Sequence, residues 1–126
     1  MSARMRVLSG LGEKGPACLR LEFFNRRWLL DCGVGPENDN GFDPAWLHKV
    51  NAVFITHDHV DHIGAAAEVV AAGLPIYCTE VTARSLPADA NVIVLPPYGE
   101  IQVDGVTVTT GRTGHSFGGV WLHFEI

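Results

Sequence analysis

The sequence has few cysteines, and their number and spacing argue against whole classes of protein. Cys18, Cys32 and Cys78 are odd in number, far apart and in no C-x-x-C pair. This pattern speaks against a disulfide framework and is typical of reduced thiols in a cytoplasmic protein. Free cysteine is also among the most frequently buried residue types, so we expect all three thiols to pack in the core.

Long apolar runs and an excess of positive charge are also missing. No stretch of about 18 apolar residues is present and the N-terminus has no apolar signal region, so we expect neither a membrane span nor a signal peptide. A net charge of -5 argues against a broad nucleic-acid-binding surface, but it leaves open a local site where bound cations attract phosphate. A hydrophobic content of 47% predicts one globular domain over residues 1–126.

Hydrophobic periodicity predicts a chain made mostly of strands. Residues 18–32 alternate and reverse at Asn25–Arg27, as in a hairpin. Residues 51–56 form a near-continuous apolar strand, which predicts burial on both faces. Further strands are predicted at residues 5–9, 75–78, 91–97, 99–103, 105–111 and 118–126.

Three short helices are predicted between these strands. Asp43 and the proline after it are typical of a helix start within residues 42–50, and Thr79 is suited to cap another. The third helix covers residues 62–73 and stops at its last glycine. Its apolar stripe is predicted to contain Ile63, Ala66, Ala67, Val70 and Leu74.

Residues 10–15, GLGEKG, fit the G-x-G-x-x-G pattern of dinucleotide-binding loops and follow a predicted strand. That binding mode needs a helix that opens at the last glycine, because the helix N-terminus holds the pyrophosphate. Here Pro16 and an alternating strand follow instead. We therefore interpret the stretch as a tight turn between strands, or as a loop whose backbone comes close to an active site.

The strongest chemical signal is the stretch THDHVDHIGA, residues 56–65. His57 and His59 are two residues apart at the end of a strand, so both side chains project the same way. Asp61 and His62 follow where a helix begins, and the chain reversal there can aim them back at the same point. Neutral imidazole is the commonest metal ligand at neutral pH. One loop can therefore supply ligands for two adjacent ions that activate a water.

The H-x-H-x-D-H order after a buried strand resembles the metallo-β-lactamase superfamily. WLLDCG, residues 28–33, and TGHSFGG, residues 113–119, match its first and third motifs in the right order. The resemblance implies an α+β fold: half of the αββα sandwich of that superfamily, with a mostly antiparallel or mixed sheet and helices on one face.

The resemblance also implies a role for particular residues. It places one zinc ion on three histidines and a second on the remaining pair, and Mn²⁺ is the alternative metal. The implied metal ligands are His57, His59 and His115 for the first ion, and Asp61 and His62 for the second. Asp61 is expected to orient the attacking water, and Asp31 is expected to orient the ligands and raise their basicity.

Residues 8–33 are most similar to the β-CASP nucleases, with a glycine-rich turn, a Cys-bearing strand and a hairpin that returns to Leu-Asp-Cys-Gly. This similarity implies a zinc-dependent hydrolase that cleaves phosphodiester bonds of nucleic acid by means of a metal-activated water. Two alternatives stay open. One is a small-molecule ester, thioester or lactam hydrolase of the same fold, and the other is a non-catalytic zinc-binding or interaction module.

Complete members of that superfamily carry a second half, which supplies a bridging aspartate and a last histidine. After His115 the only carboxylate is Glu125, which alternates with Trp121 and His123 and is expected to face away from the site. We therefore expect the N-terminal half of such a domain, weak or inactive in hydrolysis by itself. An uncovered apolar sheet face and an open edge near residues 120–126 predict self-association or pairing with the missing half.

Overall fold

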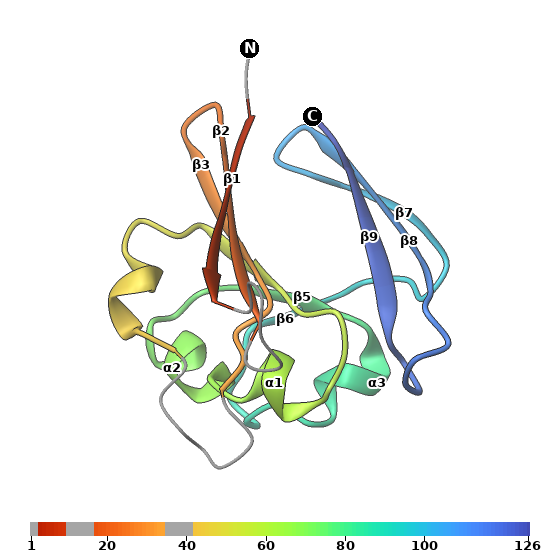
Figure 1. Cartoon of the computed structure of the whole chain (residues 1–126). Coiled ribbons are helices and arrows are strands. Elements are labelled where there is room, and N and C mark those ends of the chain that lie inside the picture. The colour runs from red at the N-terminus through yellow and green to blue at the C-terminus, as the bar shows by residue number, and fades with distance from the viewer. Residues whose placement is uncertain (1–2, 10–16, 35–41) are drawn as a thin grey trace.

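The computed structural model describes residues 3–9, 17–34 and 42–126 and arranges them in two sheets with helices on one side (Figure 1). Strands outnumber helices, so the α+β class predicted from the sequence is confirmed. The glycine-rich stretch 10–15 lies outside the described residues, and its interpretation as a turn stays a prediction.

The first sheet contains six strands in the order of the sequence. They are β1 (Ala3–Ser9), β2 (Cys18–Phe23), β3 (Arg26–Leu30), β4 (Ala52–Phe54), β5 (Ile76–Cys78) and β6 (Val92–Val94). β1, β2 and β3 pair antiparallel, whereas β3 to β6 pair parallel. The predicted hairpin is β2 and β3, although its turn residues are Phe24 and Asn25, so that the return strand begins earlier than predicted.

Short helices connect the parallel strands, because parallel pairing requires a crossover. They are the 3-10 helix η1 (Pro44–Leu47), α1 (Val60–Ile63), α2 (Ala66–Ala71) and α3 (Glu80–Ala83). Both predicted caps are confirmed: Asp43 accepts a hydrogen bond from the Ala45 N–H, and Thr79 accepts one from the Thr82 N–H. Among the described residues, no helix has the length and apolar character needed to cross a bilayer.

The single helix predicted over residues 62–73 was wrong, because a turn separates α1 from α2. The Ala65 N–H donates to the Cys32 carbonyl (2.8 Å) instead of continuing the helix. The break also changes which side chains face the core: Val69 is fully buried, whereas Ala67, part of the predicted stripe, is exposed. Gly73 has a φ of 73° and follows the end of α2, as predicted for a helix stop.

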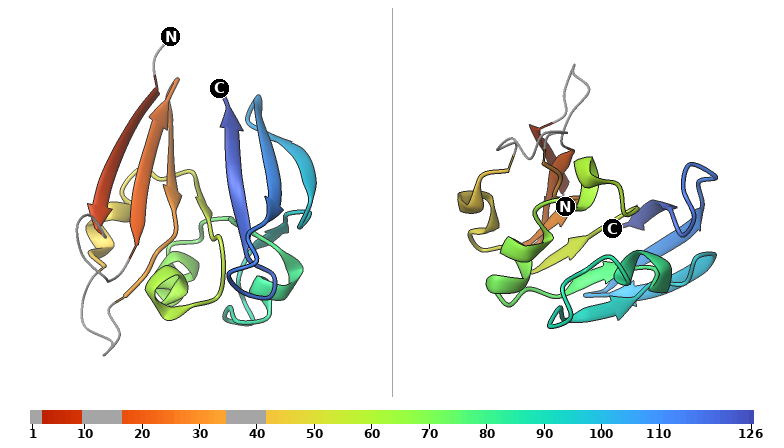
Figure 2. Two further views of the ribbon diagram at one scale, coloured as in Figure 1. Left: turned by 45° about the vertical axis from the view of Figure 1, so that its right-hand side comes forward. Right: turned by 90° about the horizontal axis from the view of Figure 1, so that it is seen from below.

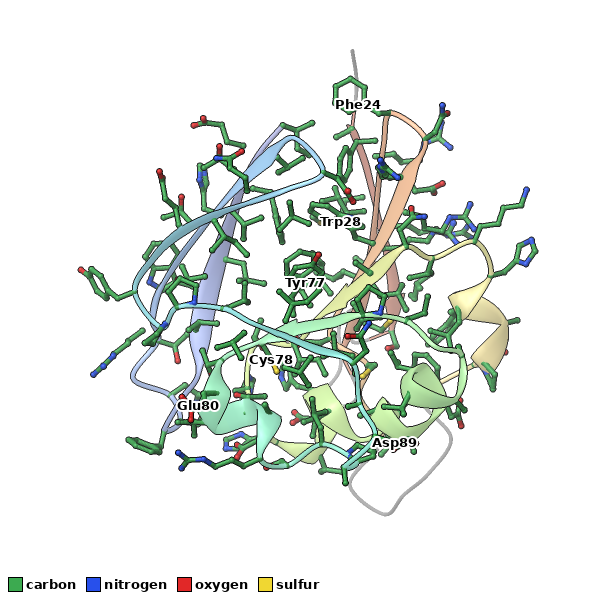
Figure 3. The ribbon with its side chains drawn as sticks, turned by 180° about the vertical axis from the view of Figure 1, so that it is seen from behind. Phe24, Trp28, Tyr77, Cys78, Glu80 and Asp89 are labelled. Atoms are coloured by element: carbon green, nitrogen blue, oxygen red, sulfur yellow. The ribbon has the colours of Figure 1, made fainter. Side chains whose placement is uncertain are left out.

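The second sheet contains β7 (Gly99–Val103), β8 (Val106–Arg112) and β9 (Val120–Glu125), all antiparallel. It stands opposite the first sheet, and the two form the layers of a sandwich (Figure 2). Trp28 and Tyr77 lie between the layers (Figure 3). Trp28 is fully buried, and its ring centroid is 4.7 Å from that of Phe23, 4.8 Å from that of Phe54 and 5.7 Å from that of Phe124.

The other face of the first sheet packs against the helices in a second apolar core. Leu29, Val53, Val69 and Ile76 are fully buried there together with the three cysteines, which are all free thiols. Burial raises the pKa of Cys18 and Cys78 to about 12. The thiols therefore stay protonated at neutral pH, and the prediction of buried cysteines is confirmed.

For the second sheet, the expectation of an uncovered apolar face was wrong. Alternation sends the Val, Leu and Phe side chains of β7 to β9 inward, where they pack against the first sheet. The outer face instead carries Glu100, Gln102, Thr107, Thr109, Trp121, His123 and Glu125. Trp121 lies over Gly111, where an added Cβ would meet its ring at 2.2 Å. The open features of this sheet are therefore its two edge strands, β7 and β9, and not an apolar face.

Candidate metal centre

The predicted site residues lie where three connections meet at one edge of the sandwich. Asp31 directly follows β3, residues 57–62 follow β4, and His115 lies between β8 and β9. Because β3 and β4 are parallel, their carboxyl ends lie side by side. The Val120 N–H, at the start of β9, donates to the Thr56 carbonyl (2.9 Å) and ties the third connection to the same edge.

Three histidines from two of these connections converge. One ring nitrogen from each of His57, His59 and His115 lies within 4.8 Å of the other two, and the ring centroids are 4.7 to 4.9 Å apart. His57 is buried, whereas His59 and His115 are exposed, so the cluster opens to solvent on one side. Three imidazoles at this spacing can hold a divalent ion and leave a fourth position free.

A second group of possible ligands shares His57 with the first. Ring nitrogens of His57 and His62 and a carboxylate oxygen of Asp61 lie within 4.8 Å of one another. Asp61 Oδ2 is 3.8 Å from His62 Nε2. Since His57 belongs to both groups, the described residues supply one complete set of three imidazoles and, beside it, two further donors.

The Asp31 carboxylate and the Thr56 hydroxyl link two of the rings by hydrogen bonds. Asp31 Oδ2 is 2.7 Å from His62 Nδ1, and Thr56 Oγ1 is 3.1 and 3.0 Å from the two Asp31 oxygens. The same hydroxyl is 2.9 Å from His57 Nδ1. A carboxylate only accepts and a hydroxyl carries one proton. Thr56 therefore donates to Asp31 and accepts from the Nδ1–H of His57.

In the neutral rings of His57 and His62, these hydrogen bonds place the lone pair on Nε2. Nε2 of His57 is buried, and no hydrogen-bond partner for it exists among the described residues. A buried polar atom without a partner is costly, and a metal ion at that atom would remove the cost. The residues present therefore fit a metal ion, and Asp31 orients two of the rings, one directly and one through Thr56.

Burial and charge shift the pKa values of the two linked histidines in opposite directions. Burial lowers the pKa of His57, and the neighbouring His62 lowers it further. For His62, burial alone would lower the pKa, but the hydrogen bond to Asp31 and its charge outweigh that effect and raise it. His57 thus favours the neutral form, which is the form that binds metals.

The Asp-Cys-Gly sequence lets residues 57–62, called the metal loop below, approach β3 closely. Asp31 is buried with a φ of 64°, a conformation that aspartate tolerates better than most residues. The Cys32 N–H donates to the His62 carbonyl (2.8 Å). A Cβ on Gly33 would lie 1.7 Å from the Asp61 carbonyl oxygen. Glycine is therefore required at position 33 for the loop to pack where it does.

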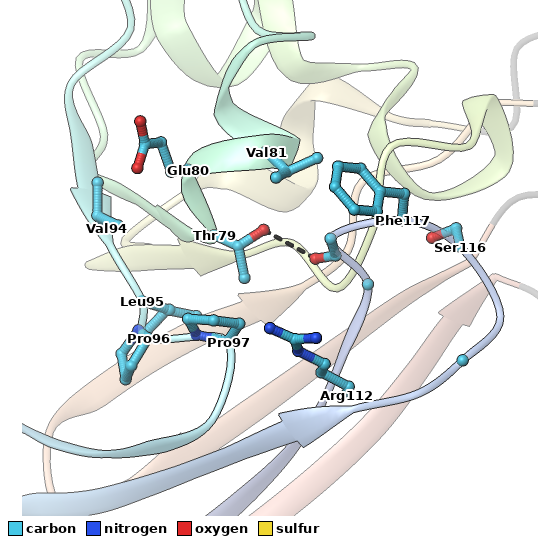
Figure 4. A pocket seen from close by; sticks show the side chains of 13 residues that line it. Thr79, Glu80, Val81, Val94, Leu95, Pro96, Pro97, Arg112, Ser116 and Phe117 are labelled. Carbon is cyan, nitrogen blue, oxygen red and sulfur yellow. Dashed lines mark hydrogen bonds between the residues drawn. The ribbon is translucent and has the colours of Figure 1, made fainter.

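The loop that carries His115 is anchored to α3. Thr79 Oγ1 donates to the Gly118 carbonyl (2.8 Å), as the dashed line in Figure 4 shows, and Gly118 has a φ of 82°. The His115 N–H donates to Thr113 Oγ1 (3.1 Å). The same loop borders a mainly apolar cavity of about 340 Å³, whose lining includes Arg112 (Figure 4). The loop that carries His115 is thus held in part by contacts with the start of α3, which lies outside the segments that carry Asp31 and the other histidines.

The structure brings every predicted site residue to this edge. They are Asp31, His57, His59, Asp61, His62 and His115. Sequence reasoning missed Thr56, which connects Asp31 to His57. Its position immediately before the first histidine was the only available signal, and a threonine that ends a strand is too common to carry weight alone.

The comparison with protein families gives a match over most of the chain. A family described as "Beta-lactamase superfamily domain" matches residues 26–122. The matched range contains the segments that carry all six predicted site residues.

Curated relatives include proteins whose names refer to transcription and RNA. The chain is 39% identical to Transcription termination factor FttA of Methanothermobacter thermautotrophicus over 98% of its own length and 25% of that protein. It is 25% identical to Ribonuclease J of Mycoplasma genitalium, over 90% of the chain and 24% of that protein. It is 34% identical to the Probable cleavage and polyadenylation specificity factor subunit 2 of Caenorhabditis briggsae, over 60% and 10%. The chain thus spans a quarter or less of these relatives.

Solved structures show the same fold at low sequence identity. The metallo-beta-lactamase fold protein YhfI of Bacillus subtilis gives a TM-score of 0.73 at 18% identity, over 97% of this chain and 57% of that one. The Rm3 metallo-beta-lactamase gives 0.71 at 18% identity, over 95% and 53%. This likeness shows the fold, and the family match shows the family. The chain belongs to the metallo-β-lactamase superfamily, within which its sequence resembles the β-CASP nuclease branch.

Proposed function

We propose that the chain is the metal-binding part of a zinc-dependent hydrolase that cleaves phosphodiester bonds in nucleic acid, with Mn²⁺ as the alternative metal. The observation that carries the proposal is the convergence of His57, His59 and His115 around a buried Nε2 atom that has no partner among the described residues. The names of the relatives support nucleic acid as the substrate, since they refer to transcription termination, a ribonuclease and polyadenylation.

In this proposal His57, His59 and His115 hold one zinc ion tightly, and Asp61 and His62 are donors to a second, weaker site. When bound, zinc supplies Lewis-acid polarisation of a phosphoryl oxygen and lowers the pKa of an attacking water. The Asp61 side chain, which is partly exposed beside the cluster, orients that water. Asp31 stays buried and hydrogen-bonded, so it is a positioning residue that acts through the two rings.

We also propose that residues 1–126 form the N-terminal half of a larger domain in a cytoplasmic protein. Solved structures of the same fold, of which the chain covers 53% to 57%, support this division. β9, one of the two edge strands of the second sheet, is the place where a further half, or a second copy, would continue that sheet. The sharing of His57 by both ligand groups agrees with a second metal site that the other half completes.

A non-catalytic zinc-binding module is the second candidate function. It is favoured by the same sharing of His57, because a chain that fixes only one ion cannot clamp both the attacking and the leaving oxygen. Hydrolysis of an activated carboxylic ester, a thioester or a lactam is the remaining alternative, since the polarised water attacks carbonyl carbon as well as phosphorus.

Zinc titration followed by hydrolysis assays tests these proposals in order. We expect one tight zinc ion per chain, its loss in His57→Ala, and slow cleavage of single-stranded RNA that disappears in His59→Ala. His123→Ala removes an exposed histidine on the outer face of the second sheet and should change neither result. Turnover of an activated ester or a lactam without RNA or DNA cleavage would favour the small-molecule alternative. Tight zinc without any turnover would favour the binding module, and no zinc binding would overturn all three.

A further inference from the structure

Most of the basic side chains lie in the first three strands of the first sheet or close to them. Six of the nine lysine and arginine residues of the chain lie in β1, in the β2–β3 hairpin and just after η1. They are Arg4, Arg6, Arg20, Arg26, Arg27 and Lys49. Four of them, Arg4, Arg26, Arg27 and Lys49, line one hollow at the hairpin end, and we call these four the hairpin-end basic surface. A chain with a net charge of -5 therefore carries a strongly positive region of its own.

Strand register places four of the six cations on one face of the sheet, whereas Arg26 lies opposite Phe23 on the other face. Arg4 lies opposite Glu22, which lies opposite Arg27, and Arg6 lies opposite Arg20. Directly opposed residues share a face of the sheet. Neighbours two residues apart along a strand are about 7 Å from one another, a spacing close to the repeat of an extended phosphodiester chain.

Few acidic groups neutralise this surface. Glu22 pairs with Arg20 (3.3 Å) and Arg27 (3.0 Å), and Asp104 lies 3.8 Å from Arg26. The hydrogen bond from Arg27 is the main reason that the pKa of Glu22 is lowered. Among the described residues, no ion pair is found for the exposed side chains of Arg4, Arg6 and Lys49, which leaves their charge free to bind an anion.

The surface is hollowed and carries an exposed aromatic ring. An open hollow of about 540 Å³ is lined by the four cations of this surface together with Glu22 and Phe24. Phe24, at the hairpin turn, is 61% exposed, and Figure 3 shows its ring at the tip of the sheet. A basic groove beside an exposed aromatic ring is the combination that binds single-stranded nucleic acid, since cations track the backbone and the ring stacks on a base.

The hollow is remote from the metal centre. β3 begins at the hairpin and ends next to Asp31, and the four residues from Arg27 to Asp31 span about 13 Å. In Figure 1 the hairpin lies at the top of the molecule, whereas α1 and the metal loop lie at the bottom. A ligand at the hairpin end therefore contacts different residues from a phosphate bound at the metal centre, and both can bind at once.

We propose that the hairpin-end basic surface binds the phosphodiester backbone of a single-stranded nucleic acid, with Phe24 stacked on one base. This gives the chain a second nucleic-acid contact besides the metal centre. The proposal rests on the proposed function only for the choice of nucleic acid as the polyanion. An acidic protein segment fits the charge but makes no specific use of an exposed phenylalanine beside the cations.

The test measures binding of a labelled short single-stranded RNA by fluorescence anisotropy at several salt concentrations. Arg4→Gln with Lys49→Asn removes two exposed charges, and asparagine tolerates the φ of 60° at position 49. We expect affinity to fall about tenfold, with a salt slope smaller by about 0.7 for each lost phosphate contact. Phe24→Ala should lower affinity about tenfold without changing the slope.

Controls separate this proposal from the proposed hydrolysis. Arg84→Gln removes an exposed charge at the end of α3 and should leave RNA affinity unchanged. His59→Ala should abolish cleavage but retain RNA binding at the hairpin end, so either proposal can fail alone. Equal affinity in wild type and in the double variant would overturn the proposal. Displacement of the RNA by poly-glutamate at equal charge concentration would overturn the choice of nucleic acid.

Discussion

The two ends of the first sheet are built in different ways. At the carboxyl ends of β3 and β4, hydrogen bonds of 2.7 to 3.1 Å from Asp31 and Thr56 fix two of the imidazole rings. At the hairpin end, exposed cations surround an open hollow, and no ion pair holds Arg4 or Lys49 among the residues described. A metal ion needs atoms placed to within a few tenths of an ångström, whereas a polyanion needs mainly charge. One sheet can therefore carry a metal site at one end and a surface for a polyanion at the other.

The largest effect should come from Gly33→Ala, which disturbs only the fixed end. The added Cβ would collide with the Asp61 carbonyl oxygen, so the metal loop must move. We expect a loss of about 3 kcal/mol or more in the free energy of unfolding, together with loss of tight zinc binding. Urea unfolding and zinc titration measure the two effects.

Gly73→Ala is the matched control, because its φ of 73° is strained for alanine but no atom lies near the new Cβ. It should cost about 1 to 2 kcal/mol and leave zinc affinity intact. If Gly33→Ala folded and bound zinc as Gly73→Ala does, the close packing of the loop would not be what positions the ligands.

A smaller and more selective effect is expected for Thr56→Val. Valine keeps the shape of threonine but removes the hydroxyl that accepts from His57 Nδ1 and donates to Asp31. Zinc affinity should fall about 10- to 100-fold, as for other groups that orient metal ligands, while RNA binding at the hairpin end stays constant. Competition with a chelator measures the affinity.

Thr56→Ser restores the hydroxyl and should recover most of the affinity. Wild-type zinc affinity in Thr56→Val would show that His57 keeps its tautomer without this hydrogen bond. A parallel loss of RNA binding in Thr56→Val would show that the two ends of the sheet are coupled and do not act independently.

The smallest effect is expected at the hairpin end, from Glu22→Gln. Arginine neighbours lower the pKa of Glu22 below its ordinary value of 4.5, so the carboxylate stabilises the fold above that pH. This contribution is lost as the pH falls through the lowered folded-state pKa. Because the group is partly exposed, we expect less than about 1 kcal/mol. Urea unfolding at neutral and acid pH measures the difference between the variant and wild type.

Glu100→Gln removes an exposed carboxylate of the second sheet that has no ion pair among the described residues, and it should leave the pH dependence unchanged. A pH dependence that is identical in wild type and in Glu22→Gln would mean that solvent screens the arginines completely.

Several features of the fold followed from local sequence because they depend on neighbours in the chain. The caps at Asp43 and Thr79 were predictable, since each accepts a hydrogen bond from a backbone N–H two or three residues away. The break between α1 and α2 was not predictable, because the Cys32 carbonyl that captures the Ala65 N–H is more than thirty residues away in the sequence. The prediction of an uncovered apolar face was wrong for the second sheet, because alternation alone does not say which face packs against another sheet.

The candidate site divides in the same way. His57, His59, Asp61 and His62 fall within six consecutive positions, so their capacity to bind metal was predictable from spacing alone. The approach of His115 to them depends on how the second sheet closes over the first, and only the resemblance to a known family suggested it. That these residues bind zinc stays a prediction, which zinc titration tests.

The sequence by itself determined the class of fold, the element types and the loop rich in metal-ligating side chains, because hydrophobic period, capping and residue spacing act over a few residues. Only the tertiary structure decided that Thr56 joins Asp31 to His57, that Gly33 must lack a side chain, and that cations from β1, the hairpin and Lys49 form one surface. These features depend on distances between residues far apart in the chain. Such distances are fixed when strand register and sheet packing bury the core, because each side chain is then held in one position relative to segments that it could not otherwise reach.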